Sequence, residues 1–424
     1  MMMPTLQTNP IQFPGREQVM RHAVLLSFCE PLPEECSCLR SLSRREWQKM
    51  LTWLDTSGLA LYFFDRMTEL GLYDMLPPEV FSRLRQNLLE NTERTSGMMA
   101  EQTAIQREFQ NAAISYAVLK GFSLWPSSLP RPELRSQLDL DFLVAEKSAP
   151  AARQILEARG YRLHAISGRS WEFKANEIHG ISLKDLYKNV PQRSVELHLE
   201  TSVSGASSVL ARIEKRPLGG ICTPVLSTID LFLGQGLHVY KHISSESSRA
   251  AHLIEFRRHV LTRYGDCAFW GELRSLAEEN RRAPIALGVV TLLISRVMGD
   301  FAPEQLTSWT VDCLPPGARL WVEQYGLRSA LANFPGSKLY LLLQRELESS
   351  GVPAKRSLRR TLLPFSLPPL IAHATANESL TMRLRRYHTQ LYFISLRLRF
   401  HIVEGLRYLG ESLRWRQLKK GLAP

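Results

Sequence analysis

Two aspartates lie one residue apart inside a short apolar run, and this pair constrains the fold of the 424-residue chain most strongly. The run covers residues 138–144 and reads LDLDFLV. Side chains alternate between the two faces of a β-strand, so Asp139 and Asp141 project together while the apolar residues between them face the other way. Carboxylates held side by side repel each other unless a divalent cation binds their oxygens. The pattern therefore predicts a strand that presents a metal site.

A third carboxylate occurs in a second alternating segment, SVELHL, which begins at Ser194. Its valine and leucines share an apolar face, whereas Glu196 and His198 share the polar face. If this strand lies next to the first, Glu196 completes a cluster of three acids with Asp139 and Asp141. His198 has two interpretations, either as a hydrogen-bonded strand residue or as a residue that supports the site.

A candidate phosphate-binding segment precedes the two aspartates. Residues 116–119 form an apolar run that predicts a strand, and Lys120 and Gly121 follow it directly. A glycine allows the backbone to approach a phosphate closely, and the hydroxyl of Ser123 can donate a hydrogen bond. The side chains of Lys120 and Arg135 could neutralise phosphate charge or form ordinary surface ion pairs.

These motifs follow one another in a fixed order along the chain. The order is Leu119-Lys120-Gly121, Arg135, Asp139-x-Asp141, a turn at Gly160-Tyr161, and Val195-Glu196-Leu197-His198. It resembles the bacterial nucleotidyltransferase-like family of the polymerase-beta nucleotidyltransferase superfamily. It is also similar to the order in the abortive-infection nucleotidyltransferase toxins. The resemblance covers roughly residues 47–300.

The resemblance implies an α+β fold, in which a small mixed-sheet nucleotidyltransferase core is flanked by helical regions. It implies an enzyme that transfers a nucleoside monophosphate from a nucleoside triphosphate to an acceptor, with Mg²⁺ or Mn²⁺ as the metal. The acceptor, whether RNA, protein or a small molecule, is not identified. The implied metal-binding and catalytic residues are Asp139, Asp141 and Glu196, and the implied nucleotide-binding residues are Lys120, Gly121, Ser123 and Arg135.

Some residues depart from the pattern of that family. Phe122 stands where a second glycine or serine of the loop is usual, and Leu138 precedes the first aspartate. These departures keep open a second interpretation, a degenerate protein that binds nucleotide or metal without transfer. His238 and Lys241 lie one turn apart on a predicted helix, and they either line the nucleotide cleft or belong to an ordinary amphipathic helix.

The periodicity of apolar residues divides the rest of the chain. Spacings of three and four residues between apolar residues predict helices before and after the nucleotidyltransferase core. Prolines interrupt this spacing near the N-terminus and near the C-terminus of the chain. We expect an irregular segment at 1–46, a helical region at 47–112, the nucleotidyltransferase core at 113–220, a second helical region at 221–350, and a proline-rich linker with a basic amphipathic helix at 351–424.

The positive charge of the chain is concentrated in its last segment. Fourteen lysines and arginines but only three acidic residues lie between Pro353 and the C-terminus, whereas the whole chain carries +12. An apolar stripe from Leu384 to Leu413 runs along the predicted helix there. We favour packing of this stripe on the body of the protein or on a partner. Binding of an anionic membrane surface or of nucleic acid phosphates are the alternatives.

The cysteines and the lack of a targeting segment predict a protein of a reducing compartment. The start of the sequence lacks the apolar core of a signal peptide, and no apolar run reaches the roughly 18 residues of a membrane span. We expect a cytoplasmic protein, membrane-peripheral if the basic helix binds lipid. The cysteines lack zinc-site spacing and are expected to be ordinary thiols; they are Cys29, Cys36, Cys38, Cys222, Cys267 and Cys313.

Overall fold

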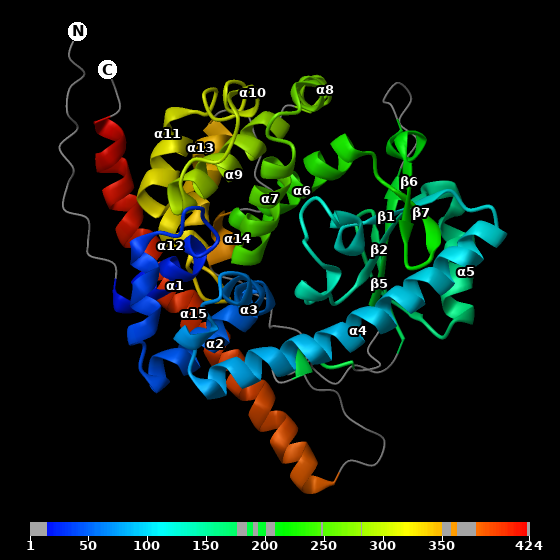
Figure 1. Ribbon diagram of the computed structural model, residues 1–424, viewed down its shortest axis with the longest axis horizontal. Helices are drawn as coiled ribbons and strands as arrows, with labels where there is room; N and C mark the ends of the chain where they lie inside the picture. Colours follow the sequence, from blue (N-terminus) through cyan, green and yellow to red (C-terminus); the bar gives the residue numbers. More distant parts are fainter. Residues whose placement is uncertain are drawn as a thin grey trace.

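The computed structural model describes residues 15–175, 185–189, 194–200, 208–246, 249–280, 282–349, 358–362 and 379–421. A mixed β-sheet and a larger group of helices lie side by side, and the long helix α4 (Pro78–Asn111) runs from the helices to the sheet (Figure 1). The predicted α+β class is confirmed. Among the described helices, none combines the length and the apolar character that crossing a bilayer requires.

Seven strands form the sheet in the order β3-β4-β5-β2-β1-β7-β6. The pairs β2–β5 and β1–β7 are parallel, and the other neighbouring pairs are antiparallel. The strands are β1 (Tyr116–Leu119), β2 (Leu140–Ala145), β3 (Arg162–Ser167), β4 (Ser170–Lys174), β5 (Ser194–Glu200), β6 (Glu214–Leu218) and β7 (Ile221–Val225).

One face of the sheet is apolar and is covered by α4 and α5 (Ala149–Ala158). The alternating residues of β2 and β5 supply this face, and Phe142 packs edge-on against Phe109 of α4 with ring centroids 5.5 Å apart. Burial of such aromatic and aliphatic side chains stabilises the sheet by about 1.5–3 kcal/mol for each side chain. Because the residues alternate, the polar side chains of β2 and β5 face away from α4 and α5.

The helical part is built around α9 (Ala283–Met298), which is buried along nearly its whole length. Helices that surround it include α1 (Arg16–Leu26), α6 (Thr228–Ile243), α7 (Ala250–Thr262) and α8 (Cys267–Glu278). The other helices are α2 (Arg44–Ser57), α3 (Ala60–Glu69), α10 (Glu304–Thr307), α11 (Pro316–Trp321), α12 (Leu327–Ala330), α13 (Tyr340–Ser349), α14 (Leu358–Leu362) and α15 (Leu380–Lys420).

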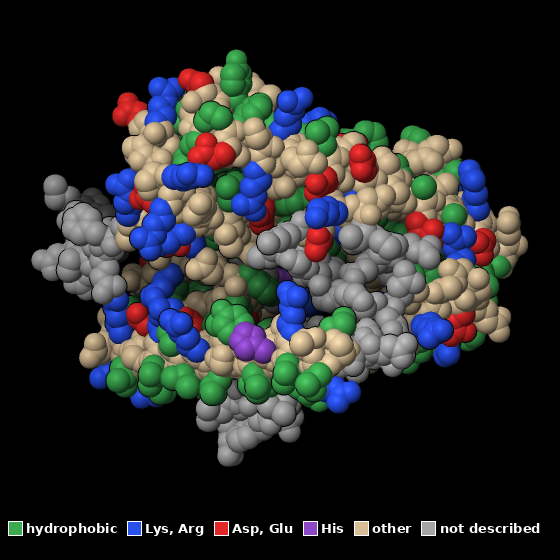
Figure 2. Space-filling view, turned by 90° about the horizontal axis from the view of Figure 1, so that it is seen from below, with side chains coloured by type: hydrophobic (Ala, Val, Ile, Leu, Met, Phe, Trp, Pro, Cys, Tyr) green, Lys and Arg blue, Asp and Glu red, His purple; other side chains and the backbone are tan. Residues whose placement is uncertain are grey.

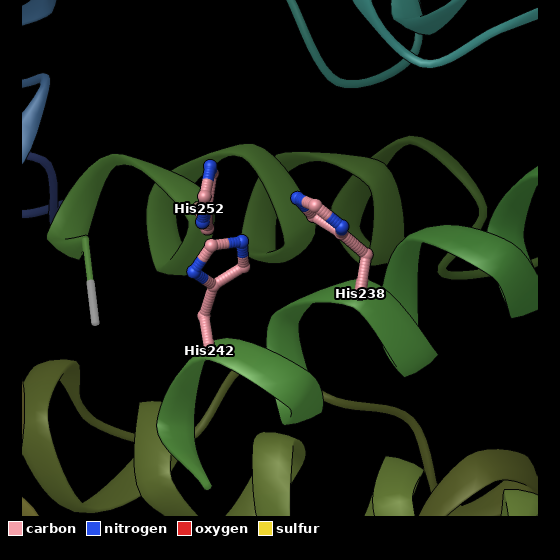
Figure 3. A group of neighbouring side chains, drawn as sticks. All are labelled: His238, His242 and His252. Atoms are coloured by element: carbon pink, nitrogen blue, oxygen red, sulfur yellow. The ribbon is translucent and has the colours of Figure 1, made fainter. Parts of the chain in front are cut away.

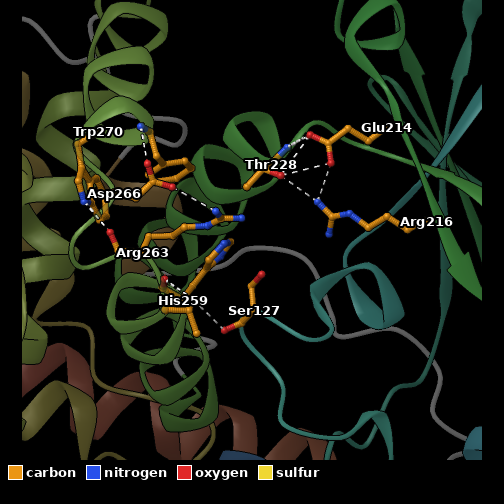
Figure 4. Close-up of polar contacts among 10 residues, drawn as sticks. Ser127, Glu214, Arg216, Thr228, His259, Arg263, Asp266 and Trp270 are labelled. Carbon is orange, nitrogen blue, oxygen red and sulfur yellow. Dashed lines mark hydrogen bonds and ion pairs between the residues drawn. The ribbon is translucent and has the colours of Figure 1, made fainter.

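Polar contacts join the sheet to the helices (Figure 4). The Glu214 carboxylate on β6 accepts a hydrogen bond from the backbone N–H of Thr228 at 2.8 Å, at the start of α6. Arg216 pairs with Glu214 at 3.0 Å and donates to the Thr228 hydroxyl. The Thr262 hydroxyl of α7 lies 3.5 Å from the Ser127 carbonyl oxygen, in the segment between β1 and β2. These contacts help to hold α6 and α7 against the sheet.

Most of the predicted elements of the core are confirmed. The strand predicted at residues 116–119 has those bounds. Gly160 has φ +84°, the left-handed conformation expected after a helix. All six cysteines are free thiols.

Two predictions about regular structure were wrong or incomplete. The N-terminal segment was expected to be irregular, but it contains α1, because its prolines flank the helix and Met20, Ala23 and Val24 are buried. The hairpin of β6 and β7 was not predicted, since Pro217 and Pro224 lie inside its strands. Pro217 is tolerated because β6 is an edge strand. Most of the expected proline-rich linker lies outside the described residues.

The C-terminal helix packs on the body through a different face from the one expected. The predicted apolar stripe is exposed, with Leu391 at 66% and Leu406 at 65%, so it does not pack on the body, and packing on a partner stays a prediction. The buried face instead carries Tyr408 and Trp415. Figure 2 shows a row of hydrophobic side chains along one edge of the molecule, at the position of α15.

Polar contacts set the rotation of α15 about its axis. The Glu404 carboxylate accepts hydrogen bonds from the Ser337 hydroxyl at 2.8 Å and from the Lys338 N–H at 3.1 Å. Farther along, Glu346 of α13 accepts from Trp415 Nε1 at 2.9 Å and pairs with Lys419 at 2.8 Å. Because these partners lie on one side of the helix, the row of leucines is turned outward.

Candidate active site

The candidate site lies on the polar face of the sheet, where two carboxylates from adjacent strands meet. Asp141 of β2 and Glu196 of β5 are direct partners in the parallel register of these strands. Asp141 is only 3% exposed, although the cost of burying an unpaired carboxylate is high. The neighbours of Asp141 must therefore balance its charge.

Two side chains supply that balance. Lys120, directly after β1, donates from Nζ to Asp141 Oδ1 at 3.0 Å. His198, two residues after Glu196 on β5, lies with Nε2 2.9 Å from the same oxygen and 3.4 Å from Glu196 Oε2. The Ser170 hydroxyl of β4 donates to the other Glu196 oxygen. The two carboxylates therefore lie in a network that contains one lysine and one histidine.

The network shifts the pKa values of its members in opposite directions. The pKa of Glu196 lies well below its usual range, chiefly because of the hydrogen bond from His198. The hydrogen bond from Ser170 acts in the same direction, and burial opposes the shift. Burial alone would lower the pKa of His198, but its hydrogen bonds to Asp141 and Glu196 outweigh burial and raise it. Glu196 is thus ionised at neutral pH, and protonated His198 is favoured.

Asp139 precedes β2 and behaves differently. Burial, followed by repulsion from Asp141, raises its pKa to about 6, while Lys120 and Arg135 oppose the rise. The Gln137 side chain donates to the Asp139 carbonyl oxygen at 2.7 Å and so fixes the backbone there. Asp139 is close enough to Asp141 and Glu196 to interact with them electrostatically, but the ligand atoms that lie within 4.8 Å of one another come from Asp141, Glu196 and His198 and not from Asp139. The place of Asp139 in a metal site stays a prediction. Asp139 has the least charge compensation of the three carboxylates.

The loop after β1 has a strained backbone. Lys120 and Gly121 have φ values of +50° and +46°, and a Cβ on Gly121 would lie 2.4 Å from the Gln137 side chain. Glycine is therefore required at this position. The Ser123 hydroxyl is buried and donates to the Lys120 carbonyl oxygen at 2.7 Å. This bond turns Ser123 inward, so its contact with a phosphate stays a prediction.

Arg135 lies between the sheet and α7. Its Nε donates to Glu255 Oε1 at 3.1 Å, and the Tyr62 hydroxyl donates to the same oxygen at 2.8 Å. Arg249, at the start of α7, is close enough to interact electrostatically with Asp139 and Arg135. The candidate site therefore faces α7, and cationic side chains from both parts of the protein surround its carboxylates.

The donor set of this site fits a hard divalent cation. Asp141, Glu196 and His198 each offer a ligand atom, and these atoms lie within 4.8 Å of one another. Carboxylate oxygens are the ligands that Mg²⁺ prefers, and a nearby histidine usually supports such ligands from outside. A cation at Asp141 and Glu196 would take over the role of the positive charges on Lys120 and His198.

Several residues of the site were not found from the sequence. Ser170 reaches Glu196 only because β4 pairs with β5, and the order of strands cannot be read from a local pattern. Glu255 and Arg249 come from α7, more than a hundred residues after Asp141. The spacing of Glu196 and His198 on one strand was a usable signal, and it placed both residues on the correct face.

Comparisons with known proteins agree with the geometry at the level of the family. A search of curated proteins finds no match. Among solved structures, an antigenic nucleotidyltransferase-like protein from Paracoccidioides brasiliensis is 12% identical, with 51% of this chain and 97% of that chain covered and a TM-score of 0.30. This likeness is too distant to support an argument.

The family assignment depends on a different finding. The family model described as uncharacterised nucleotidyltransferase matches residues 43–298, which is more than half of the chain. The matched residues include every residue of the candidate site named above. The chain thus belongs to this family of uncharacterised nucleotidyltransferases.

Proposed function

We propose that the protein transfers a nucleoside monophosphate from a nucleoside triphosphate to an acceptor hydroxyl, with Mg²⁺ or Mn²⁺ at its carboxylates. Membership of the nucleotidyltransferase family supports the class of reaction. The observation that carries the proposal is the pairing of Asp141 with Glu196 across adjacent parallel strands, with Asp139 close by. The catalytic core would lie within residues 113–220, between the two helical regions.

In the proposed reaction, an acceptor oxygen attacks the α-phosphorus of the triphosphate. The bond between the α-phosphorus and the bridging oxygen breaks with its electron pair on the leaving pyrophosphate, and the hydroxyl passes its proton to a carboxylate of the site or to water. Asp139, Asp141 and Glu196 would hold the divalent metal, which when bound stabilises the charge on the attacking and leaving oxygens. The acceptor, whether RNA, protein or a small molecule, stays open, and so does the similarity to abortive-infection toxins.

The residues around the carboxylates have further roles in the proposal. Lys120 is paired with the Asp141 carboxylate in the structure. Its Nζ would become available to a phosphate once another cation neutralises that carboxylate. His198 would lose its proton for the same reason and remain as a hydrogen-bonding support. Arg135 would add positive charge near the phosphate. Gly121 is buried against the Gln137 side chain, so its contact with a phosphate stays a prediction from the resemblance.

A degenerate protein is the competing interpretation. Lys120 and His198 already balance the charge of Asp141, so the fold does not need a metal to keep this carboxylate buried. Phe122, which departs from the usual loop, is also buried in the core of the sheet. A protein of this kind would bind nucleotide or metal and would transfer nothing, which a direct assay distinguishes.

We expect the full chain, with Mg²⁺ or Mn²⁺ and each α-labelled nucleoside triphosphate, to label one class of acceptor from total RNA, cell lysate or the protein itself. D141N and E196Q should each reduce labelling at least about a hundredfold, because each removes a charged ligand atom from the reacting centre. E157Q, on the exposed side of α5, is the matched control and should label normally. Folded protein that binds nucleotide but labels nothing would favour the degenerate interpretation.

The raised pKa of Asp139 predicts an effect of pH on stability. Its pKa rises from 3.8 to about 6 on folding, so the ionised carboxylate destabilises the metal-free fold at pH 8 and the penalty disappears below about pH 4. D139N should therefore be more stable than the wild type by on the order of 2 kcal/mol at pH 8, and the two should converge at pH 4.

Chemical denaturation with and without Mg²⁺ measures this effect. Mg²⁺ should raise the free energy of unfolding of the wild type more than that of D139N, because binding stabilises only a fold that holds the ion. If D139N is less stable than the wild type at pH 8 without metal, or if Mg²⁺ stabilises both equally, Asp139 does not carry an uncompensated charge that a metal relieves.

We also propose that α15 binds an anionic membrane surface. Its exposed row includes Leu384, Leu391, Leu398 and Leu406, and the helix contains ten basic residues but only two glutamates. Glu404 and Glu411 are both engaged by groups of the body. A second copy of the helix would bring like charges together, so lipid headgroups suit this face better.

The double variant L391S/L398S should bind anionic vesicles of phosphatidylserine and phosphatidylcholine at least about tenfold more weakly than the wild type, because each leucine loses apolar burial in the bilayer. L89S, at an exposed leucine of α4, is the matched control and should bind normally. Co-sedimentation measures both. The assignment would be contradicted if the wild type bound purely neutral vesicles equally well. It would also be contradicted if the double variant lost self-association or RNA binding but still bound vesicles.

A further inference from the structure

Three histidines converge at the junction of α6 and α7, outside the carboxylate site. His238 and His242 lie one turn apart on α6, and His252 lies on α7 (Figure 3). The three rings point toward one another, with centroids 4.5, 4.6 and 5.1 Å apart. One ring nitrogen from each lies within 4.8 Å of the others. Three imidazoles therefore share one small space.

The surroundings of His238 and His252 favour their neutral forms. Burial, followed by the charges of His242 and Lys120, lowers the pKa of His238 to about 2. Burial also lowers the pKa of His252 well below its usual value, and the other two histidines add to the effect. A neutral imidazole offers a nitrogen lone pair, which is the form that binds a metal.

His252 has an unmet requirement in the structure. It is 7% exposed, and its Nδ1 is buried without a hydrogen-bond partner. A buried polar atom that lacks a partner costs about 1–3 kcal/mol. The atom belongs to a ring on which two more imidazoles converge, and a metal bound through Nδ1 would supply what is missing.

We propose that His238, His242 and His252 bind a transition-metal ion of the Zn²⁺ class. Imidazole nitrogen suits Zn²⁺, Co²⁺ and Ni²⁺, whereas Mg²⁺ requires oxygen, so this site differs in chemistry from the one at Asp141 and Glu196. Two histidines at positions i and i+4 of a helix share a face, and a third from a neighbouring helix completes a three-nitrogen set. Such a set leaves a fourth position open for water or an anion.

The charges around the cluster define what the fourth ligand can be. Lys120 and Lys241 act on His238, and Arg249 acts on His252. Arg135 acts on both, and Glu255 offsets part of its charge at 3.1 Å. This surplus of positive charge opposes the binding of a metal ion alone and favours a metal ion whose fourth ligand is an anion. Phosphate should therefore strengthen metal binding at this site.

Packing without a ligand is the competing explanation, since neighbouring rings often meet edge to face as His238 and His242 do. It accounts for the ring geometry, but it leaves His252 Nδ1 without a partner. It also predicts that the apoprotein gains nothing from Zn²⁺ or Co²⁺, which makes the two explanations distinguishable in solution.

Titration of the full chain with Co²⁺, followed by visible absorption, tests the proposal without an activity assay. The wild type should develop the intense absorption of four-coordinate Co²⁺ at one equivalent, and excess Zn²⁺ should abolish it. H238Q, H242Q and H252Q should each weaken Co²⁺ binding at least about tenfold, because each removes one of only three protein ligands. H164Q, at an exposed histidine of β3, is the matched control.

The carboxylate site provides a second control, because His198 could also bind Co²⁺. D141N/E196Q should keep the absorption if the ion lies at the three histidines. Absorption lost in D141N/E196Q, or retained in both H242Q and H252Q, would overturn the assignment, as would a wild type without absorption. Circular dichroism identifies any variant that fails to fold. H242Q then decides the outcome, since His242 is only partly buried near the end of α6.

Discussion

A buried carboxylate on a parallel pair of strands is the constraint on which the rest of the site depends. Asp141 is placed beside Glu196 by the register of β2 and β5, and the apolar alternation of both strands fixes that register. A shift by one residue would move Phe142 into the polar face and Asp141 into the core. The hydrophobic packing under α4 and α5 therefore determines where the charges lie.

The buried charge in turn specifies its surroundings. Lys120 arrives from the end of β1 and His198 from β5, and both reach the same oxygen of Asp141. The strained backbone at Lys120 and Gly121 belongs to the same arrangement, because it begins the turn that directly follows the strand. In the structure the carboxylates are balanced by protein cations. Metal binding would be an exchange of one set of positive charges for another, accompanied by proton release.

Local periodicity was enough to predict the strands that carry the site. Alternation over two residues identified β2 and β5, and it placed Asp141, Glu196 and His198 on one face. Contacts between distant segments were beyond such patterns. The contact of Ser170 with Glu196 depends on the order of the strands. The contact of Glu255 with Arg135 depends on where α7 packs.

The helices show the same limit in a different form. The spacing of leucines in α15 correctly predicted a long helix, but the side that packs was set by Glu404, Trp415 and their partners on the body. The predicted apolar stripe is therefore present on the helix, but it does not pack on the body. The three-histidine cluster could not be predicted from local patterns either, because the packing of α7 against α6 brings His252 to His238 and His242.

A crystal structure with Mn²⁺ and a non-hydrolysable nucleoside triphosphate would test the central claim most directly. We expect an anomalous peak between the carboxylates of Asp139, Asp141 and Glu196, with Lys120 moved from Asp141 onto a phosphate. Mn²⁺ and triphosphate bound elsewhere, with Lys120 and His198 still on Asp141, would contradict it and would identify the carboxylates as a structural network.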